Sequence, residues 1–128
     1  MNFERKIFVS EAARPLRVAV IGAGPAGIYT ADILTKSEEV RTGAVEVAID
    51  IFDRYPAPFG LIRYGVAPDH PRIKGIITAR HKVLDRGDIR FFGNVEYGKD
   101  LTLADLREHY DAIICATGAI FDAPLNIK

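Results

Sequence analysis

The chain has 128 residues, a length that suits one domain with one core. Hydrophobic residues make up 48% and charged residues 27%, the balance of a folded globular protein rather than a disordered or fibrous one. Lys and Arg together number 17, as do Asp and Glu, so no net positive charge favours a nucleic acid or an anionic membrane surface as partner.

Cysteine usage and the first residues indicate the cell compartment. Cys115 is the single cysteine, so the chain cannot form an internal disulfide, and no Cys/His spacing predicts a metal site. Residues 1–14 lack the apolar run of a signal peptide, and Glu4 and Glu11 argue against a transit peptide. No stretch approaches the length of a transmembrane helix. We therefore expect a cytoplasmic protein without a membrane segment.

The first elements are a strand and a helix joined by glycines. A β-branched run at 17–21 stops at Gly22 and predicts a buried parallel strand. The helix is predicted from Pro25 to about Lys36, because Pro suits the first helical turn. Its expected apolar face consists of Ala26, Tyr29, Ile33 and Leu34.

The middle of the chain alternates between a strand, a loop and a helix. Apolar and polar residues alternate over 45–52, which predicts a second strand near a sheet edge. Prolines and glycines interrupt 53–71 too often for a regular element, so we predict a long shaped loop. A helix capped by Asp69 and ending at Gly87 follows, with Ile73, Ile76, Ile77, Val83 and Leu84 on its apolar face.

Two more strands complete the predicted sheet. Residues 89–92 form the third strand, and residues 111–115 form the fourth. Thr102 and Asp105 match a capping box at the start of the helix between them. Strands that alternate with helices indicate a parallel sheet, so we predict an α/β, Rossmann-like doubly wound fold with strand order three, two, one, four.

The turn after the first strand has the G-x-G-x-x-G pattern of dinucleotide-binding proteins. Its position between a strand and a helix is the one that phosphate binding requires, because the helix N-terminus offers unpaired N–H groups to the pyrophosphate. A glycine-rich turn that binds nothing is the alternative. The predicted contacts are Gly22, Gly24, Pro25, Ala26 and Gly27.

An acidic residue stands where such a site holds a ribose. Asp53 follows the second strand, and its carboxylate can accept hydrogen bonds from ribose hydroxyls, worth about 1.5–3 kcal/mol. A carboxylate repels a 2′-phosphate, so FAD or NAD is favoured, although the neighbouring Arg54 could favour a phosphate. A solvated loop aspartate is the alternative.

Two further segments resemble flavoprotein motifs. The run RYPAPFGLIRYGVAPDHP at 54–71 closely resembles the signature loop of adrenodoxin reductase-type ferredoxin:NADP reductases. Its prolines and glycines suit a rigid, non-repetitive backbone held against a flat ring system. Residues 116–118, Ala-Thr-Gly, resemble the second motif of flavoproteins with two dinucleotide-binding domains, and residues 92–95 also match the reductase family.

The resemblance implies that residues 15–128 are the FAD-binding domain of such a flavoprotein and that 1–14 are an extension. It adds six expected cofactor contacts, which are Arg54, Gly60, Leu61, Val95, Thr117 and Gly118. The parent enzyme would pass electrons from NADPH to a ferredoxin-type iron-sulfur protein, with the flavin doing the chemistry and no residue of this chain acting as a proton-transfer catalyst. We expect the NADP domain and the C-terminal flavin contacts to be absent, which would leave this chain inactive alone and prone to self-association.

Two alternatives are left open. One is the FAD domain of another pyridine-nucleotide flavoprotein, such as a glutamate synthase small-subunit-like protein. The other is a dinucleotide-binding module without catalytic function. Reduction of a bound flavin by NADPH would distinguish an electron carrier from such a module.

Overall fold

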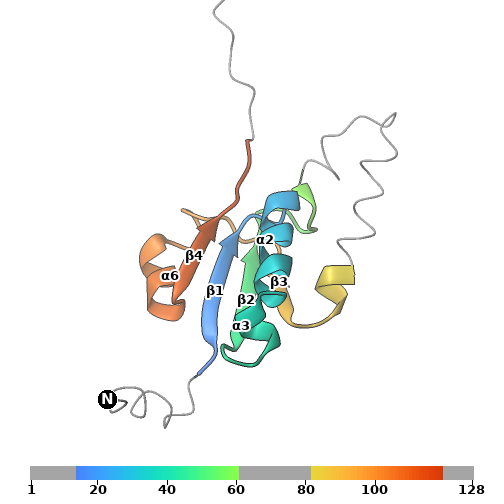
Figure 1. Cartoon of the computed structure of the whole chain (residues 1–128). Coiled ribbons are helices and arrows are strands. Elements are labelled where there is room, and N and C mark those ends of the chain that lie inside the picture. Colours follow the sequence, from blue (N-terminus) through green and yellow to red (C-terminus); the bar gives the residue numbers. More distant parts are fainter. Residues whose placement is uncertain (1–13, 61–81, 120–128) are drawn as a thin grey trace, which may run out of the picture.

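A single parallel sheet organises the chain in the computed structural model, which describes residues 14–60 and 82–119 (Figure 1). Its strand order is β3-β2-β1-β4, as predicted. The strands are β1 (Leu16–Ile21), β2 (Val47–Phe52), β3 (Ile89–Phe92) and β4 (Ala112–Cys115). Together with the helices on its two faces, this arrangement is a Rossmann-like α/β fold.

The four strands end at the same level of the sheet. Ile21 pairs with Phe52 on one side and with Cys115 on the other, and Phe52 pairs with Phe92. The residues that follow the strands therefore meet at one edge. Strands β2 and β3 lie on one side of β1, and β4 lies on the other side. Sheets of α/β proteins bind ligands at such a switch in strand order.

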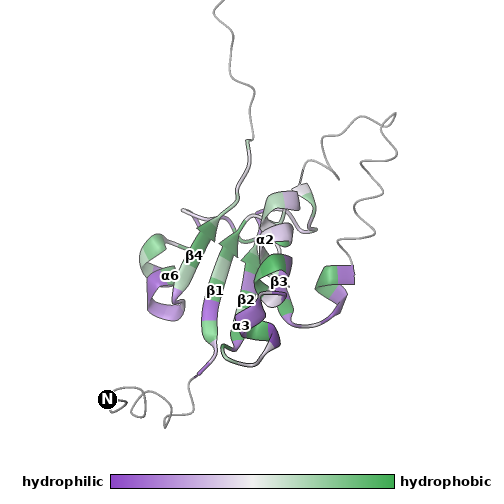
Figure 2. Cartoon of the chain, in the orientation of Figure 1, coloured by the Kyte–Doolittle hydropathy of each residue, from purple (hydrophilic) through white to green (hydrophobic). Residues whose placement is uncertain are grey.

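Helices pack on both faces of the sheet (Figure 1). α2 (Pro25–Thr35) packs on the face that carries Val18, Val20, Ile49 and Ile51, and α6 (Leu103–His109) packs on the face of Ala19 and Ile21. Adjacent residues of β1 thus pack into hydrophobic clusters on opposite faces of the sheet, as expected for a strand covered on both sides. In Figure 2 the carboxyl ends of β1 and β4 have hydrophobic colours.

The capping box predicted for α6 is confirmed. The Thr102 side chain accepts the Asp105 N–H at 3.2 Å, and the Asp105 carboxylate accepts the Thr102 N–H at 2.8 Å. Two N–H groups that lack partners within the helix are thereby satisfied. The helix fixes the position at which β4 begins.

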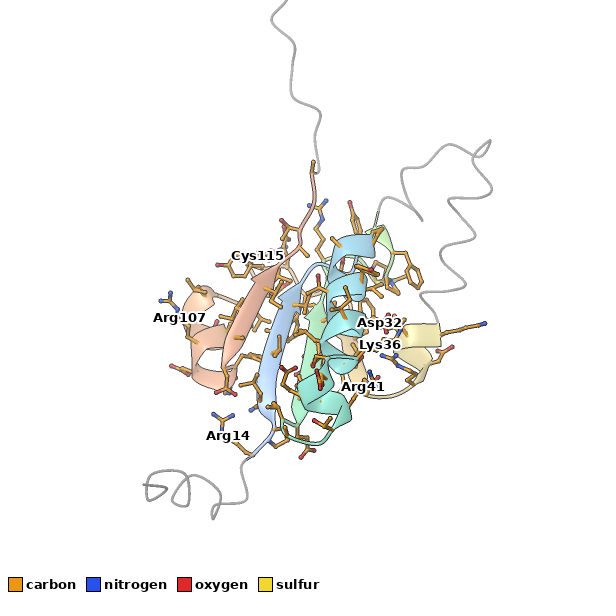
Figure 3. All side chains as sticks on the ribbon, in the orientation of Figure 1. Arg14, Asp32, Lys36, Arg41, Arg107 and Cys115 are labelled. Carbon is orange, nitrogen blue, oxygen red and sulfur yellow. The ribbon has the colours of Figure 1, made fainter. Side chains whose placement is uncertain are left out.

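The apolar face predicted for α2 is wrong in part. Tyr29 and Ile33 are 51% and 50% exposed, and the residues that α2 buries are Gly27, Ile28, Ala31 and Asp32. Small residues on this face let the helix lie close to the sheet. Asp32 tolerates burial because Lys36 and Arg86 pair with it, at 2.9 and 3.0 Å (Figure 3 labels Asp32 and Lys36).

β2 is a central strand and not the edge strand that its alternating pattern indicated. Asp50 is 3% exposed, and both of its carboxylate oxygens accept hydrogen bonds from Arg90, at 2.7 and 2.8 Å. The Tyr110 hydroxyl donates to the same carboxylate at 2.6 Å. The polar residue in the middle of this strand is therefore a buried carboxylate that pairs with an exposed arginine.

Other differences concern short segments. The polar connection after α2 contains a four-residue helix, α3 (Glu38–Arg41), and β2 starts at Val47, two residues later than predicted. Of the helix predicted at 69–87, the described part is helical over 82–85. Cys115, expected inside a buried strand, is exposed because β4 pairs only with β1 in the described sheet (Figure 3).

The start of β1 is joined to the start of β4. The Arg14 guanidinium donates to both carboxylate oxygens of Asp111, and the Arg17 N–H also donates to this carboxylate, at 2.9 Å. Arg14, assigned above to the amino-terminal extension, thus contacts the sheet. Within the described residues no helix is long and apolar enough to cross a membrane, and no group of three or more His, Cys, Asp or Glu could hold a metal ion.

Candidate dinucleotide-binding site

Packing explains two of the three fingerprint glycines. Gly22 has a φ of 112°, and a side chain there would overlap the Ala116 carbonyl oxygen. A side chain at Gly27 would overlap the Gly22 carbonyl oxygen. These two glycines let β1, β4 and the first turn of α2 come close together.

Packing does not explain the third glycine, Gly24. Its φ is −74°, which any residue can adopt, and a Cβ atom added there would find no atom of the described residues within 4 Å. The space above Gly24 is therefore open on the side where the turn faces solvent. An absent side chain at an open position suits the close approach of a ligand to the backbone, which is the role that the fingerprint gives this residue.

The first turn of α2 has N–H groups available for an anion. The first hydrogen bond of the helix runs from the Ile28 N–H to the Gly24 carbonyl, at 3.1 Å, so the N–H groups of Ala26 and Gly27 precede the helical ladder. Pro25 occupies the first helical turn and has no N–H. The helix is 11 residues long, and its N-terminus carries a partial positive charge.

Asp53 lies at the predicted position and is already held by backbone groups. Its Oδ2 accepts the Ala23 N–H at 2.7 Å, and its Oδ1 accepts the Tyr55 N–H at 2.9 Å. A carboxylate has about four lone-pair sites, so each oxygen can still accept a ribose hydroxyl. The sequence predicted the position of Asp53 after the second strand, but not its hydrogen bond to the glycine turn.

The segment 53–60 folds back onto the glycine turn. The Phe59 N–H donates to the Ala23 carbonyl at 2.7 Å, and a Cβ atom added at Gly60 would lie 3.2 Å from the Gly24 Cα. Gly60, a predicted contact, is thus beside the turn. Phe59 was not predicted as a site residue, although a large apolar residue in a Pro/Gly-rich loop was a usable signal. Leu61 lies outside the described residues.

Arg54 points its guanidinium group at its neighbour Tyr55. One guanidinium nitrogen donates to the Tyr55 hydroxyl at 2.9 Å, and the Arg54 Cζ lies 4.7 Å from the centre of the Tyr55 ring. Arg54 is half-buried and follows Asp53 directly. The pair forms a flat, positively charged surface next to the carboxylate, at the place expected for the adenosine end of a dinucleotide.

Val95 is brought to Asp53 by the strand order. The Val95 N–H donates to the Asp53 carbonyl at 2.9 Å, and the Asn94 N–H donates to the Tyr55 carbonyl at 3.1 Å. Gly93 allows this contact, since a Cβ atom there would lie 2.8 Å from the Pro56 carbonyl oxygen. The end of β3 therefore borders the candidate site, with Val95 half-buried beside it.

The end of β4 borders the site from the other side. The Ala116 N–H donates to the Ile21 carbonyl at 2.7 Å, which holds Ala116 against Gly22. Thr117 and Gly118 follow and are exposed, and Gly118 has a φ of 66° with open space around it. The structure therefore gathers the predicted site residues that it describes at the carboxyl edge of the sheet. The glycine turn lies between the ends of β2 and β3 on one side and the end of β4 on the other.

This arrangement can bind a ligand but offers little chemistry of its own. It combines a glycine turn at a helix N-terminus, a fixed carboxylate and an arginine-tyrosine pair, an arrangement that suits the pyrophosphate and ribose of a dinucleotide. Among the described residues, no cluster of metal-ligating side chains lies at this edge.

The chain is similar in sequence to reductases of known function. It is 46% identical over 122 residues to the mitochondrial NADPH:adrenodoxin oxidoreductase of Arabidopsis thaliana, covering 95% of this chain and 24% of the relative. The NADPH-ferredoxin reductase FprA of Mycobacterium leprae is 44% identical over 110 residues, covering 86% and 24%. The chain spans about a quarter of the length of these relatives. No protein-family model matches it.

A solved structure gives the same result for the fold. FprA of Mycobacterium tuberculosis in complex with NADPH matches with a TM-score of 0.82 and 42% sequence identity, covering 89% of this chain and 25% of that one. Sequence identity at this level together with the shared fold indicates common ancestry. The chain is a homologue of the N-terminal part of the adrenodoxin reductase-type NADPH-ferredoxin reductases.

Proposed function

We propose that this chain binds FAD in an extended form across the carboxyl ends of its strands. The observation that carries the proposal is the open backbone at Gly24 next to the fixed carboxylate of Asp53. A phosphate group at the first turn of α2 and a ribose at the end of β2 are the two requirements of an adenine dinucleotide. The resemblance of residues 54–71 to the signature loop of adrenodoxin reductase-type flavoproteins supports a flavin over NAD as its other half.

Several of the predicted contacts have a defined binding task in this proposal. The N–H groups of Gly24, Ala26 and Gly27 donate to the pyrophosphate, and the Asp53 carboxylate accepts from the ribose hydroxyls. Val95 supplies an apolar contact at the adenosine end. Thr117 and Gly118 let the end of β4 approach the cofactor from the opposite side. Bound FAD would supply the ability to accept a hydride and to release single electrons.

We further propose that the chain serves electron transfer from NADPH to a ferredoxin-type iron-sulfur protein. The names of its relatives, NADPH:adrenodoxin oxidoreductase and NADPH-ferredoxin reductase, support this activity for them. Because the chain spans about a quarter of their length, NADPH and the iron-sulfur partner would depend on further protein segments.

The test is a visible absorption spectrum of the purified chain after FAD has been added and unbound cofactor has been removed by gel filtration. The proposal expects a flavin spectrum that elutes with the protein. A colourless protein that is folded by circular dichroism would contradict the assignment of FAD to this chain. The elution volume in the same experiment reports self-association, which we propose for the chain on its own.

The proposed compartment is the cytosol, supported by a single cysteine that cannot form an internal disulfide. Several relatives are named as mitochondrial proteins, so the mitochondrion is the alternative compartment. Subcellular fractionation of the native protein would decide between them. Recovery with mitochondrial markers would overturn the cytosolic proposal.

A further inference from the structure

Ala23 is held on both sides by the segment 53–60. Its N–H donates to the Asp53 carboxylate and its carbonyl accepts the Phe59 N–H, each at 2.7 Å. The Ala23 carbonyl and the Gly24 N–H belong to one planar trans peptide group, so they point in opposite directions. The hydrogen bond from Phe59 therefore sets the direction of the Gly24 N–H.

Phe59 makes this hydrogen bond from an unusual backbone conformation. Its φ is 90°, a region that aromatic residues rarely adopt and that costs about 1–3 kcal/mol. Its side chain is fully buried in the core that also contains Val20 and Ile28. Burial of the ring therefore stabilises a conformation that the backbone alone disfavours.

The ring of Phe59 is fully buried, so it is not part of the surface that a bound ligand would touch. We infer that Phe59 is a positioning residue: burial of its ring holds its N–H on the Ala23 carbonyl, and this aims the Gly24 N–H at the pyrophosphate of the dinucleotide. The inference rests on the proposed function, because it assumes that a pyrophosphate binds at this turn. It adds a residue that has no contact with the ligand to those that set its affinity.

The test compares Phe59→Leu with Ile49→Val in the full 128-residue chain. Ile49 is a matched control because it is 1% exposed and belongs to the same core, but it pairs with Ile89 at the other end of the strands. Urea unfolding gives the loss of stability in each variant, and titration gives the dissociation constant for FAD. We expect Phe59→Leu to raise that constant about tenfold, and Ile49→Val to leave it unchanged.

A second measurement reads the turn directly without FAD. Amide NMR of the free chain should show a shifted Gly24 signal in Phe59→Leu and an unshifted one in Ile49→Val. If Phe59→Leu does not fold, Phe59→Met, whose flexible side chain adapts better to the space left by the ring, takes its place in both measurements.

The outcomes separate this inference from the proposed function. A wild-type chain that binds no FAD would overturn the proposed function, and the Gly24 signal would still test the role of Phe59. An unshifted Gly24 signal in the Phe59 variant would overturn the inference. Losses of FAD affinity that merely follow the losses of stability in both variants would also overturn it, since they would give Phe59 a structural role only.

Discussion

The side chain of Asp53 joins the end of β2 to the glycine turn, because its Oδ2 accepts the Ala23 N–H at 2.7 Å. The residue that is proposed to bind the ribose thus also fixes the backbone that is proposed to bind the pyrophosphate. These two halves of the site come from segments 30 residues apart in sequence. A change at Asp53 should therefore affect both halves.

Asp53→Ala should weaken FAD binding by more than it weakens the fold. The substitution removes a charged acceptor of the ribose hydroxyls, worth about 1.5–3 kcal/mol, which corresponds to roughly a 10- to 150-fold increase in the dissociation constant. Titration with FAD measures the affinity, and urea unfolding measures the stability. Asp85→Ala removes an exposed carboxylate on the 82–85 helical segment and serves as the control. Equal affinities for Asp53→Ala and wild type would refute the ribose assignment.

The glycine fingerprint gives a pair of substitutions with opposite expected effects. Gly24→Ala adds a methyl group in open space at a φ of −74°, so stability should change by less than about 0.5 kcal/mol while FAD affinity falls. Gly27→Ala pushes a methyl group into the Gly22 carbonyl and should destabilise the chain by about 3 kcal/mol. Urea unfolding and FAD titration separate the two. If Gly24→Ala kept full FAD affinity, the pyrophosphate would not lie over this turn.

Local patterns were sufficient to predict the strands and their order. The run at 17–21 ends at a glycine, and the capping box of Thr102 and Asp105 marks the start of α6. The buried face of α2 was less predictable, because hydrophobicity pointed to Tyr29 and Ile33 while the helix buries small residues and Asp32. Of the two partners that permit this burial, Lys36 is four residues from Asp32, but Arg86 is distant in sequence and no local pattern reveals it.

The candidate site was predictable where it depends on strand ends. Gly24 and Asp53 each follow a strand, and parallel strands bring such residues to one edge. The contribution of Phe59 was not predictable, since the composition of the loop indicated irregular structure but not its path. Only the structure shows that this residue adopts a positive φ and reaches the Ala23 carbonyl.

The buried carboxylate of Asp50 in β2 predicts a specific loss of stability. Tyr110→Phe removes the hydroxyl that donates to Asp50 at 2.6 Å and leaves a buried carboxylate with one partner fewer, which should cost about 1–2 kcal/mol. Tyr97→Phe is the matched control, because Tyr97 is 42% exposed and lies away from Asp50. Urea unfolding of both variants at neutral pH measures the difference. Equal stabilities of the two variants would show that the hydroxyl contributes nothing.

The same carboxylate predicts how stability depends on pH. Burial disfavours the charged form of Asp50, but hydrogen bonds from Arg90 and Tyr110 outweigh burial and lower its pKa below the ordinary value. The unfolded chain therefore binds a proton at a higher pH than the folded chain does, so this contribution is complete above about pH 4 and is lost as the pH falls through the folded pKa.

Replacing the carboxylate tests this contribution to acid stability. The Asp50→Asn variant should be less stable than wild type at pH 7, because a neutral amide binds Arg90 less strongly. Its stability should also decrease less steeply as the pH falls below about 4, where the Asp50 contribution is lost from the wild type. Urea midpoints measured across this range give both slopes. Parallel curves for the two proteins would mean that other carboxylates account for the acid sensitivity of the fold. Candidates are Asp32 and Asp111, because hydrogen bonds and ion pairs with basic residues also lower their pKa values.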